Sequence, residues 1–268
     1  MGRTLPMNDR AGAWLDAGLR HRLWFSESDD HGSTSLPFAL FDRGDLAVAR
    51  HVTCGAVAGR EVRAFDLDIL VRSDGSAGSG SRLVLAGELF EGVFEEETVT
   101  GYTLTQRWEC AVVRAGAECW RLAVSPEGVL STLADVALVP DQDLELEAFN
   151  RAFEVRADDR RFANDFLDPR MASFLLERAI GCVLEIVGNR ILVARPAGRL
   201  PDLDSLLALA FGVADRVPNA VITLHPALPA GELTPRCPIG ADGRTRSVSP
   251  PQGRVPFDPW PDVPSGWA

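Results

Sequence analysis

The chain has 268 residues, of which 46% are apolar and 24% charged, as in a folded globular protein of one large or two small domains. Its net charge of −11 and pI of about 4.9 argue against general binding to nucleic acids or anionic membranes. All 27 basic residues are arginine, which excludes P-loop ATPases, kinases, Ser-x-x-Lys acyl enzymes and pyridoxal enzymes that need their own lysine. Arginine in place of lysine is also typical of a high-GC bacterium.

Cysteine usage and hydropathy predict a cytoplasmic protein. The five cysteines have no Cys-x-x-Cys spacing, which predicts reduced structural thiols and no zinc or dense disulfide framework. Charged residues interrupt the apolar residues of the N-terminus, so we predict no signal peptide. No stretch is apolar enough to predict an integral membrane segment.

Residues 1–35 are predicted to form a helix followed by a loop. Trp14, Leu15, Leu19 and Leu23 have a helix-like spacing within residues 11–25, although two glycines interrupt the stretch. A polar loop is expected from residue 26 to residue 35.

Residues 36–124 are predicted to be rich in β-structure. Alternating apolar residues on both sides of Ala58-Gly59 predict an antiparallel hairpin with one buried face. A Gly/Ser-rich flexible loop is expected at 73–81. A second hairpin is expected, with its strands near 102–112 and 120–124.

Residues 125–225 are predicted to combine helices with a β-hairpin. Ser125 is expected to cap a helix that runs to about Ala134, and a short strand is expected at 153–155. Three further helices are expected to begin near Asp159, Asp168 and Asp202. Gly188-Asn189 predicts a tight turn between strands 183–187 and 190–195.

Residues 226–268 contain ten prolines and five glycines without a sustained period, which predicts a flexible, disordered tail. The expected fold class is therefore α+β, with antiparallel hairpins in the N-terminal part and helices plus a hairpin in the C-terminal part. We expect the parts 36–124 and 125–225 to share one core.

The segment 149–176, FNRAFEVRADDRRFANDFLDPRMASFLL, resembles the bacterial family known as domain of unknown function 3137. The positions that match its pattern are Phe153, Val155, Asp158, Asp159, Ala163, Leu167, Pro169, Met171 and Leu175. Segments 55–65, 122–128 and 143–147 are also similar, and the resemblance extends over about residues 36–217. Many members have N-terminal membrane helices, so this chain resembles a soluble variant. The resemblance implies no particular activity, cofactor or catalytic residue.

The clearest candidate for catalysis is a histidine beside two carboxylates. If Ala58-Gly59 is a two-residue turn, His51 faces Asp66, and Asp68 lies diagonally on the same face. These groups could form a general base or part of a metal site. We favour the alternative, a solvated cross-strand charge pair, because no nucleophile or third ligand lies nearby in sequence. No metal ligand set and no cofactor site are predicted.

The tail carries the candidate docking residues Phe257, Trp260 and Trp267 in a Pro-rich context. Aromatic side chains on a stiff, extended chain suit docking into a groove on a partner. The alternative is that the tail packs back on its own domain.

We therefore predict a cytoplasmic adaptor, a protein without enzymatic activity that binds a protein partner through its sheet face or its tail. One alternative is an enzyme of undescribed type, such as a hydrolase that uses His51, Asp66 and Asp68. Another is a peripheral subunit of a membrane-associated complex, which only the family resemblance suggests.

Overall fold

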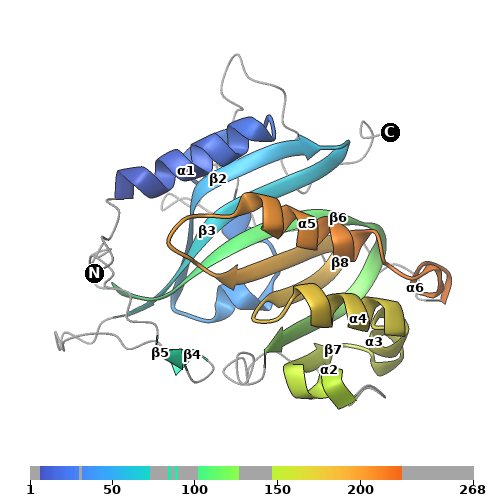
Figure 1. Cartoon of the computed structure of the whole chain (residues 1–268). Helices are drawn as coiled ribbons and strands as arrows, with labels where there is room; N and C mark the ends of the chain where they lie inside the picture. Colours follow the sequence, from blue (N-terminus) through green and yellow to red (C-terminus); the bar gives the residue numbers. More distant parts are fainter. Residues whose placement is uncertain are drawn as a thin grey trace, which may run out of the picture.

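The computed structural model describes residues 7–29, 32–72, 84–85, 88–89, 102–126 and 147–224. It confirms the α+β class (Figure 1). The predicted loop at 73–81, the predicted helix beyond Pro126 and the predicted tail with its three aromatic residues lie outside the described residues. The elements in chain order are α1 (Met7–Arg20), β1 (Trp24–Ser28), the 3-10 helices η1 (Ser33–Ser35) and η2 (Ala39–Asp42), β2 (Leu46–Val57), β3 (Arg60–Arg72), β4 (Val84–Leu85), β5 (Glu88–Leu89), β6 (Tyr102–Pro126), α2 (Glu147–Ala152), β7 (Phe153–Ala157), α3 (Arg160–Phe166), α4 (Pro169–Arg178), β8 (Val183–Pro196), α5 (Leu203–Ala214) and α6 (Asn219–Leu224).

Six antiparallel strands of the described chain form one sheet in the order β1-β2-β3-β6-β7, with β8 also paired to β6. Strand β6 joins the two halves, since its first part pairs with β3 and its last residues pair with β7. The predicted parts 36–124 and 125–225 thus contribute strands to the same sheet. No helix of the described residues is long and apolar enough to cross a membrane.

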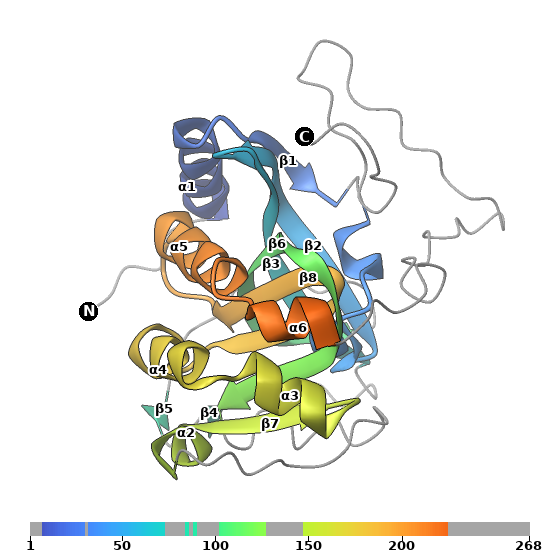
Figure 2. The same cartoon turned by 90° about the vertical axis from the view of Figure 1, so that its right-hand side faces the viewer.

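Both faces of the sheet are covered. Figure 2 shows the helices, including α1 and α5, on one side and the segment that carries η1 and η2 on the other. We call residues 33–42 the strap. The prediction that the β2–β3 hairpin has one buried face is therefore wrong, because residues 61–70 of β3 are all buried. The helical side holds the larger apolar core, and the strap covers a second core that includes Phe65 and Leu67.

The β2–β3 hairpin is confirmed at the predicted turn. Val57 pairs with Arg60, and both Ala58 (φ 51°) and Gly59 (φ 77°) are left-handed, as a type I′ turn requires. The predicted register holds as far as Thr53, which pairs with Ala64. A bulge then shifts the pairing by one residue.

The two other predicted hairpins are wrong. Residues 102–126 form the single strand β6, and residues 183–196 form the single strand β8, and these strands pair with each other. Gly188 (φ 60°) and Gly116 (φ 74°) adopt turn-like backbone angles but lie within the strands. Between the pairs Arg114–Arg190 and Cys119–Gly188, β6 advances five residues and β8 two. The glycines thus accommodate an irregular bulge in a continuous ladder.

The predicted helix starts in the C-terminal half are confirmed. The carboxylate of Asp159 accepts a hydrogen bond from the amide of Phe162, and Asp168 and Asp202 cap α4 and α5 in the same way. The predicted strand at 153–155 is β7.

Two predicted boundaries need correction. Ser125 caps no helix, because it continues β6 and pairs with Glu154 of β7. The first helix ends at Arg20 rather than at residue 25, and Trp24 already pairs with Cys54 in the sheet. The left-handed backbone of Arg22 (φ 58°) makes the turn between these elements.

Candidate functional site

The candidate residues lie in a group of charged side chains between the sheet and α1, which we call the charge cluster. It consists of Arg10, Arg50, His51, Asp66, Asp68, Arg107, Glu109 and Arg195. The strands align these residues in rows, since Asp66 pairs with Glu109, Glu109 with Arg195, and Asp68 with Arg107. Helix α1, which lies on the helical side of the sheet (Figure 2), supplies Arg10.

Asp66 lies at the centre of the charge cluster and is 1% exposed. Its Oδ2 accepts hydrogen bonds from Arg10 Nε (2.7 Å), Trp14 Nε1 (2.9 Å) and His51 Nδ1 (2.9 Å), and its Oδ1 accepts one from Arg10 Nη2 (2.5 Å). Burial would raise the pKa of Asp66, but the hydrogen bonds and charges of His51 and Arg10 outweigh it, so the pKa is lowered. Asp66 is therefore an ionised anchor for α1.

Glu109 is the second buried anchor of the helix. Its Oε1 accepts from Arg10 Nη2 (3.0 Å) and from the amide of Gly198 (3.3 Å), whereas Arg195 donates Nε (2.9 Å) and Nη2 (2.6 Å) to Oε2. Arg10 also donates Nη1 to the carbonyl of Gly198 at 2.8 Å. One guanidinium thus connects α1 to two strands and to the loop after β8.

The structure brings His51 and Asp66 together, as predicted, but not in the predicted register. The bulge places Arg50 opposite Asp66, and His51 reaches the carboxylate from a left-handed backbone position (φ 52°). Asp68 binds Arg107 Nη2 at 2.9 Å and lies 3.3 Å from Arg50 Nε.

The expectation of a solvated pair is wrong, because His51 is 8% exposed. The physical reason is that α1 covers the polar face of the hairpin and brings complementary charge to it.

This arrangement offers little to a substrate or a metal ion. The four protein donors occupy both oxygens of Asp66, and Arg107 binds both oxygens of Asp68. Within the described part of the chain, no group of three or more His, Cys, Asp or Glu is placed to hold a metal ion.

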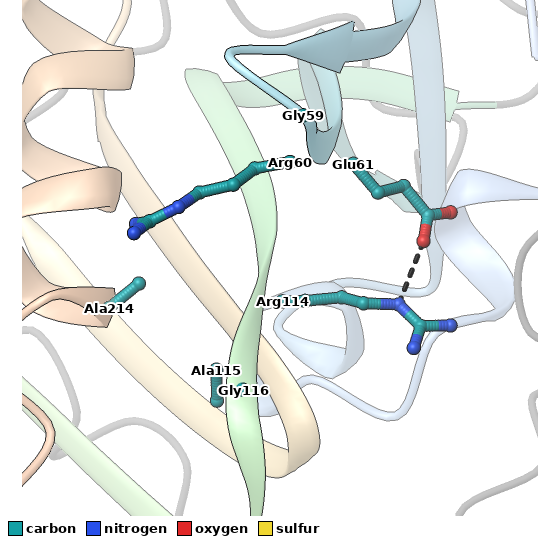
Figure 3. A pocket seen from close by; sticks show the side chains of 7 residues that line it. All are labelled: Gly59, Arg60, Glu61, Arg114, Ala115, Gly116 and Ala214. Atoms are coloured by element: carbon teal, nitrogen blue, oxygen red, sulfur yellow. Dashed lines mark hydrogen bonds and ion pairs between the residues drawn. The ribbon is translucent and has the colours of Figure 1, made fainter. Parts of the chain in front are cut away.

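A cleft of about 290 Å³ lies elsewhere, at the turn of the β2–β3 hairpin. It is lined by Gly59, Arg60, Glu61, Arg114, Ala115, Gly116 and Ala214 (Figure 3). In Figure 3 the Arg60 side chain extends toward Ala214, whereas Glu61 points away from it and accepts a hydrogen bond from Arg114 Nε at 2.8 Å. Burial raises the pKa of Glu61, although Arg114 opposes the shift. Arg60 forms an ion pair with Asp215 of the same chain. The three charged side chains that line the cleft therefore each interact with another side chain of this protein.

Sequence reasoning missed Arg10, Glu109 and Arg195. Arg10 precedes the predicted helix by one residue, although its spacing of four from Trp14 places both on one helix face. That spacing was the available signal. The contact between Glu109 and Arg195 could not be predicted, because each of their strands was expected to pair within its own separate hairpin.

Comparison with known proteins gives a distant similarity among solved structures. No family model matches the chain, and no curated protein matches it. Among solved structures, the mycobacterial trehalose monomycolate transport factor A, TtfA, is similar at a TM-score of 0.48 and 11% identity, covering 82% of this chain and 97% of that chain. A TM-score of this size does not establish a common fold. These comparisons do not test the resemblance to the domain of unknown function 3137 family, which stays a prediction.

Proposed function

We propose that the chain is a cytoplasmic protein without enzymatic activity that binds a protein partner through its C-terminal segment 226–268. The observation that carries the proposal is the saturation of Asp66, whose carboxylate accepts four protein hydrogen bonds while 1% exposed. A general base needs a free acceptor within reach of the substrate proton, which the saturated Asp66 lacks, and His51, the other candidate base, is 8% exposed. The His51–Asp66 pair instead holds α1 on the sheet.

The coverage of the sheet supports the tail over the sheet face as the docking element. The helices occupy one face and the strap the other, so a partner would have to displace one of them. The tail carries Phe257, Trp260 and Trp267 between prolines. Proline restricts the unbound chain, which reduces the entropy lost when these aromatic side chains enter a groove.

Affinity purification from the native host tests the proposal. The tagged full chain is compared with a variant carrying Phe257→Ala, Trp260→Ala and Trp267→Ala, and with a matched control carrying Asp258→Ala and Asp262→Ala in the same segment. We expect one partner that the wild type and the control retain and the aromatic variant loses. With that partner purified, calorimetry should show an affinity loss of about tenfold or more, as for hot-spot aromatic residues. Equal retention by all three chains would refute the proposal.

Two other outcomes would replace this function. Hydrolysis of ester, peptide or phosphate substrates that disappears in a folded His51→Ala variant would establish the enzyme that uses His51, Asp66 and Asp68. Co-purification with an integral membrane protein that does not depend on the three aromatic residues would favour a peripheral subunit of a membrane complex.

A further inference from the structure

Glu185 lies in β8 on the face of the sheet opposite the helices and is 1% exposed. Its Oε2 accepts a hydrogen bond from the amide of Ala39 at 2.6 Å, and its Oε1 accepts one from the amide of Leu40 at 2.7 Å. These amides are the first two of η2, in the C-terminal half of the strap. The buried side chain of Glu185 therefore holds the strap at the start of η2.

The strap closes the second apolar core. Its buried side chains include Phe38 and Phe41, whose rings pack edge to face with centroids 5.5 Å apart, and Phe41 also packs against Phe65 of β3. Beneath it lie Leu67 and Cys110, which are fully buried. Opening the strap would expose these side chains to water.

The strap is attached by side chains rather than by a β-ladder. Among the described residues it belongs to no strand pair, and its internal backbone hydrogen bonds, such as Phe41 to Phe38, stay within the segment. At its start, Asp29 accepts from the amide of Ser33 at 2.8 Å. The strap can therefore separate from the sheet without breaking any strand pairing.

Burial disfavours the charged form of Glu185. Desolvation is the largest effect and raises its pKa to about 7, although the hydrogen bonds from the two amides and the charge of Arg121 lower it. Asp42, the last residue of the strap, raises the pKa of Glu185 further, and the guanidinium of Arg43, which directly follows the strap, interacts electrostatically with the Glu185 side chain. The thiol of Cys110 faces the same region, and burial raises its pKa well above the usual value.

We propose that the strap is a proton-linked cover, which opens more often as Glu185 ionises. The closed state favours the neutral carboxyl because the site is dry. In the open state water solvates Glu185, which favours the carboxylate. Proton linkage then requires that a rise in pH through neutrality shifts the equilibrium toward the open state.

The accessibility of Cys110 to N-ethylmaleimide measures this opening. Cys119 is also buried but belongs to the core on the helical side, so its labelling reports global unfolding instead. Each rate is obtained by peptide mass spectrometry and divided by the rate of the same cysteine in the urea-unfolded chain at the same pH. This removes the intrinsic pH dependence of the thiol.

We expect the normalised Cys110 rate to rise about tenfold between pH 6 and pH 9, from the difference between an ordinary glutamate pKa and the raised one. The Cys119 rate should not follow it. In Glu185→Gln and Glu185→Met, which are neutral at every pH, the Cys110 rate should stay flat. Glu177→Gln, an exposed glutamate on α4, should behave like the wild type.

A flat wild-type Cys110 profile would overturn the proposal, and so would the same rise in Glu185→Gln or an equal rise at Cys119. If neither neutral variant folds, hydrogen exchange of the Ala39 and Leu40 amides in the wild type decides. Opening constants for these amides that rise with pH support the cover, and constants independent of pH refute it.

Discussion

Replacing Arg10 with alanine should be among the most damaging single changes in the described chain. Arg10 is 9% exposed and donates to Asp66, Glu109 and the carbonyl of Gly198. Removing it leaves two carboxylates, each 1% exposed, with fewer donors in a dry interior. Breaking a buried ion pair in this way costs about 3–5 kcal/mol, so we expect the free energy of unfolding to fall by about that amount.

Urea denaturation followed by tryptophan fluorescence measures the loss. Arg20→Ala is the matched control, because Arg20 lies on the same helix but forms an exposed ion pair with Asp204 and should lose less than about 1 kcal/mol. Arg10→Lys keeps the charge but not the fork of donors, and should recover less than about half of the loss. If Arg10→Ala and Arg20→Ala lose equally little, the charge cluster does not anchor α1 and the reasoning fails.

Four further predictions follow from the same contacts. His51→Ala should cost about 1–3 kcal/mol in urea denaturation, since Asp66 loses a buried donor; a loss below about 0.5 kcal/mol would contradict the buried pair. Asp66→Asn should have a lower free energy of unfolding than the wild type at pH 7. This difference should become smaller below about pH 4, because the stability that a lowered pKa provides is lost as the carboxylate protonates. A difference that stays constant down to about pH 2 would contradict this reasoning. Asp168→Ala should lower the free energy of unfolding by about 1 kcal/mol, because Asp168 caps α4. An unchanged urea midpoint would show that Asp168 is not the cap. The chain 1–225 should melt within about 5 °C of the full chain, and a drop above about 10 °C would make the tail part of the core.

Local signals predicted what lies within a few residues of them. The helix starts near Asp159 and Asp168 are predictable because a capping carboxylate bonds an amide only three residues away. Ala58-Gly59 likewise determined the hairpin and its register up to Thr53. The register beyond depends on the bulge near His51, which no turn residue marks.

Glycine was the misleading signal in the second half of the sheet. Gly188-Asn189 has the composition of a type I′ turn, and Gly188 does adopt a left-handed φ of 60°. A bulge needs the same backbone angles as a turn, so composition alone does not distinguish them. What decides is the partner strand, and β6 lies about 70 residues earlier in the chain.

The charge cluster was only half predictable for a related reason. His51 and Asp66 belong to one hairpin, so alternation placed them on one face. That face was predicted to be solvated because no nucleophile or third ligand lies near His51 in sequence. The charges that make its burial possible come from Arg10 of α1 and Arg107 of β6, and local periodicity contains no information on which distant segment covers a polar face.

The charge cluster also determines where α1 lies along the sheet. Trp14 and Ala17 bury the apolar face of the helix, and apolar contacts of this kind tolerate sliding because they have no preferred direction. A slide of one turn would move Arg10 by about 5.4 Å, out of hydrogen-bond distance from both Asp66 and Glu109. Two buried carboxylates would then lose its guanidinium, and Trp14 Nε1 would lose its acceptor. Since each such loss costs far more than a shifted apolar contact, the polar residues select one position of α1, and the apolar residues supply most of the attraction that holds it there.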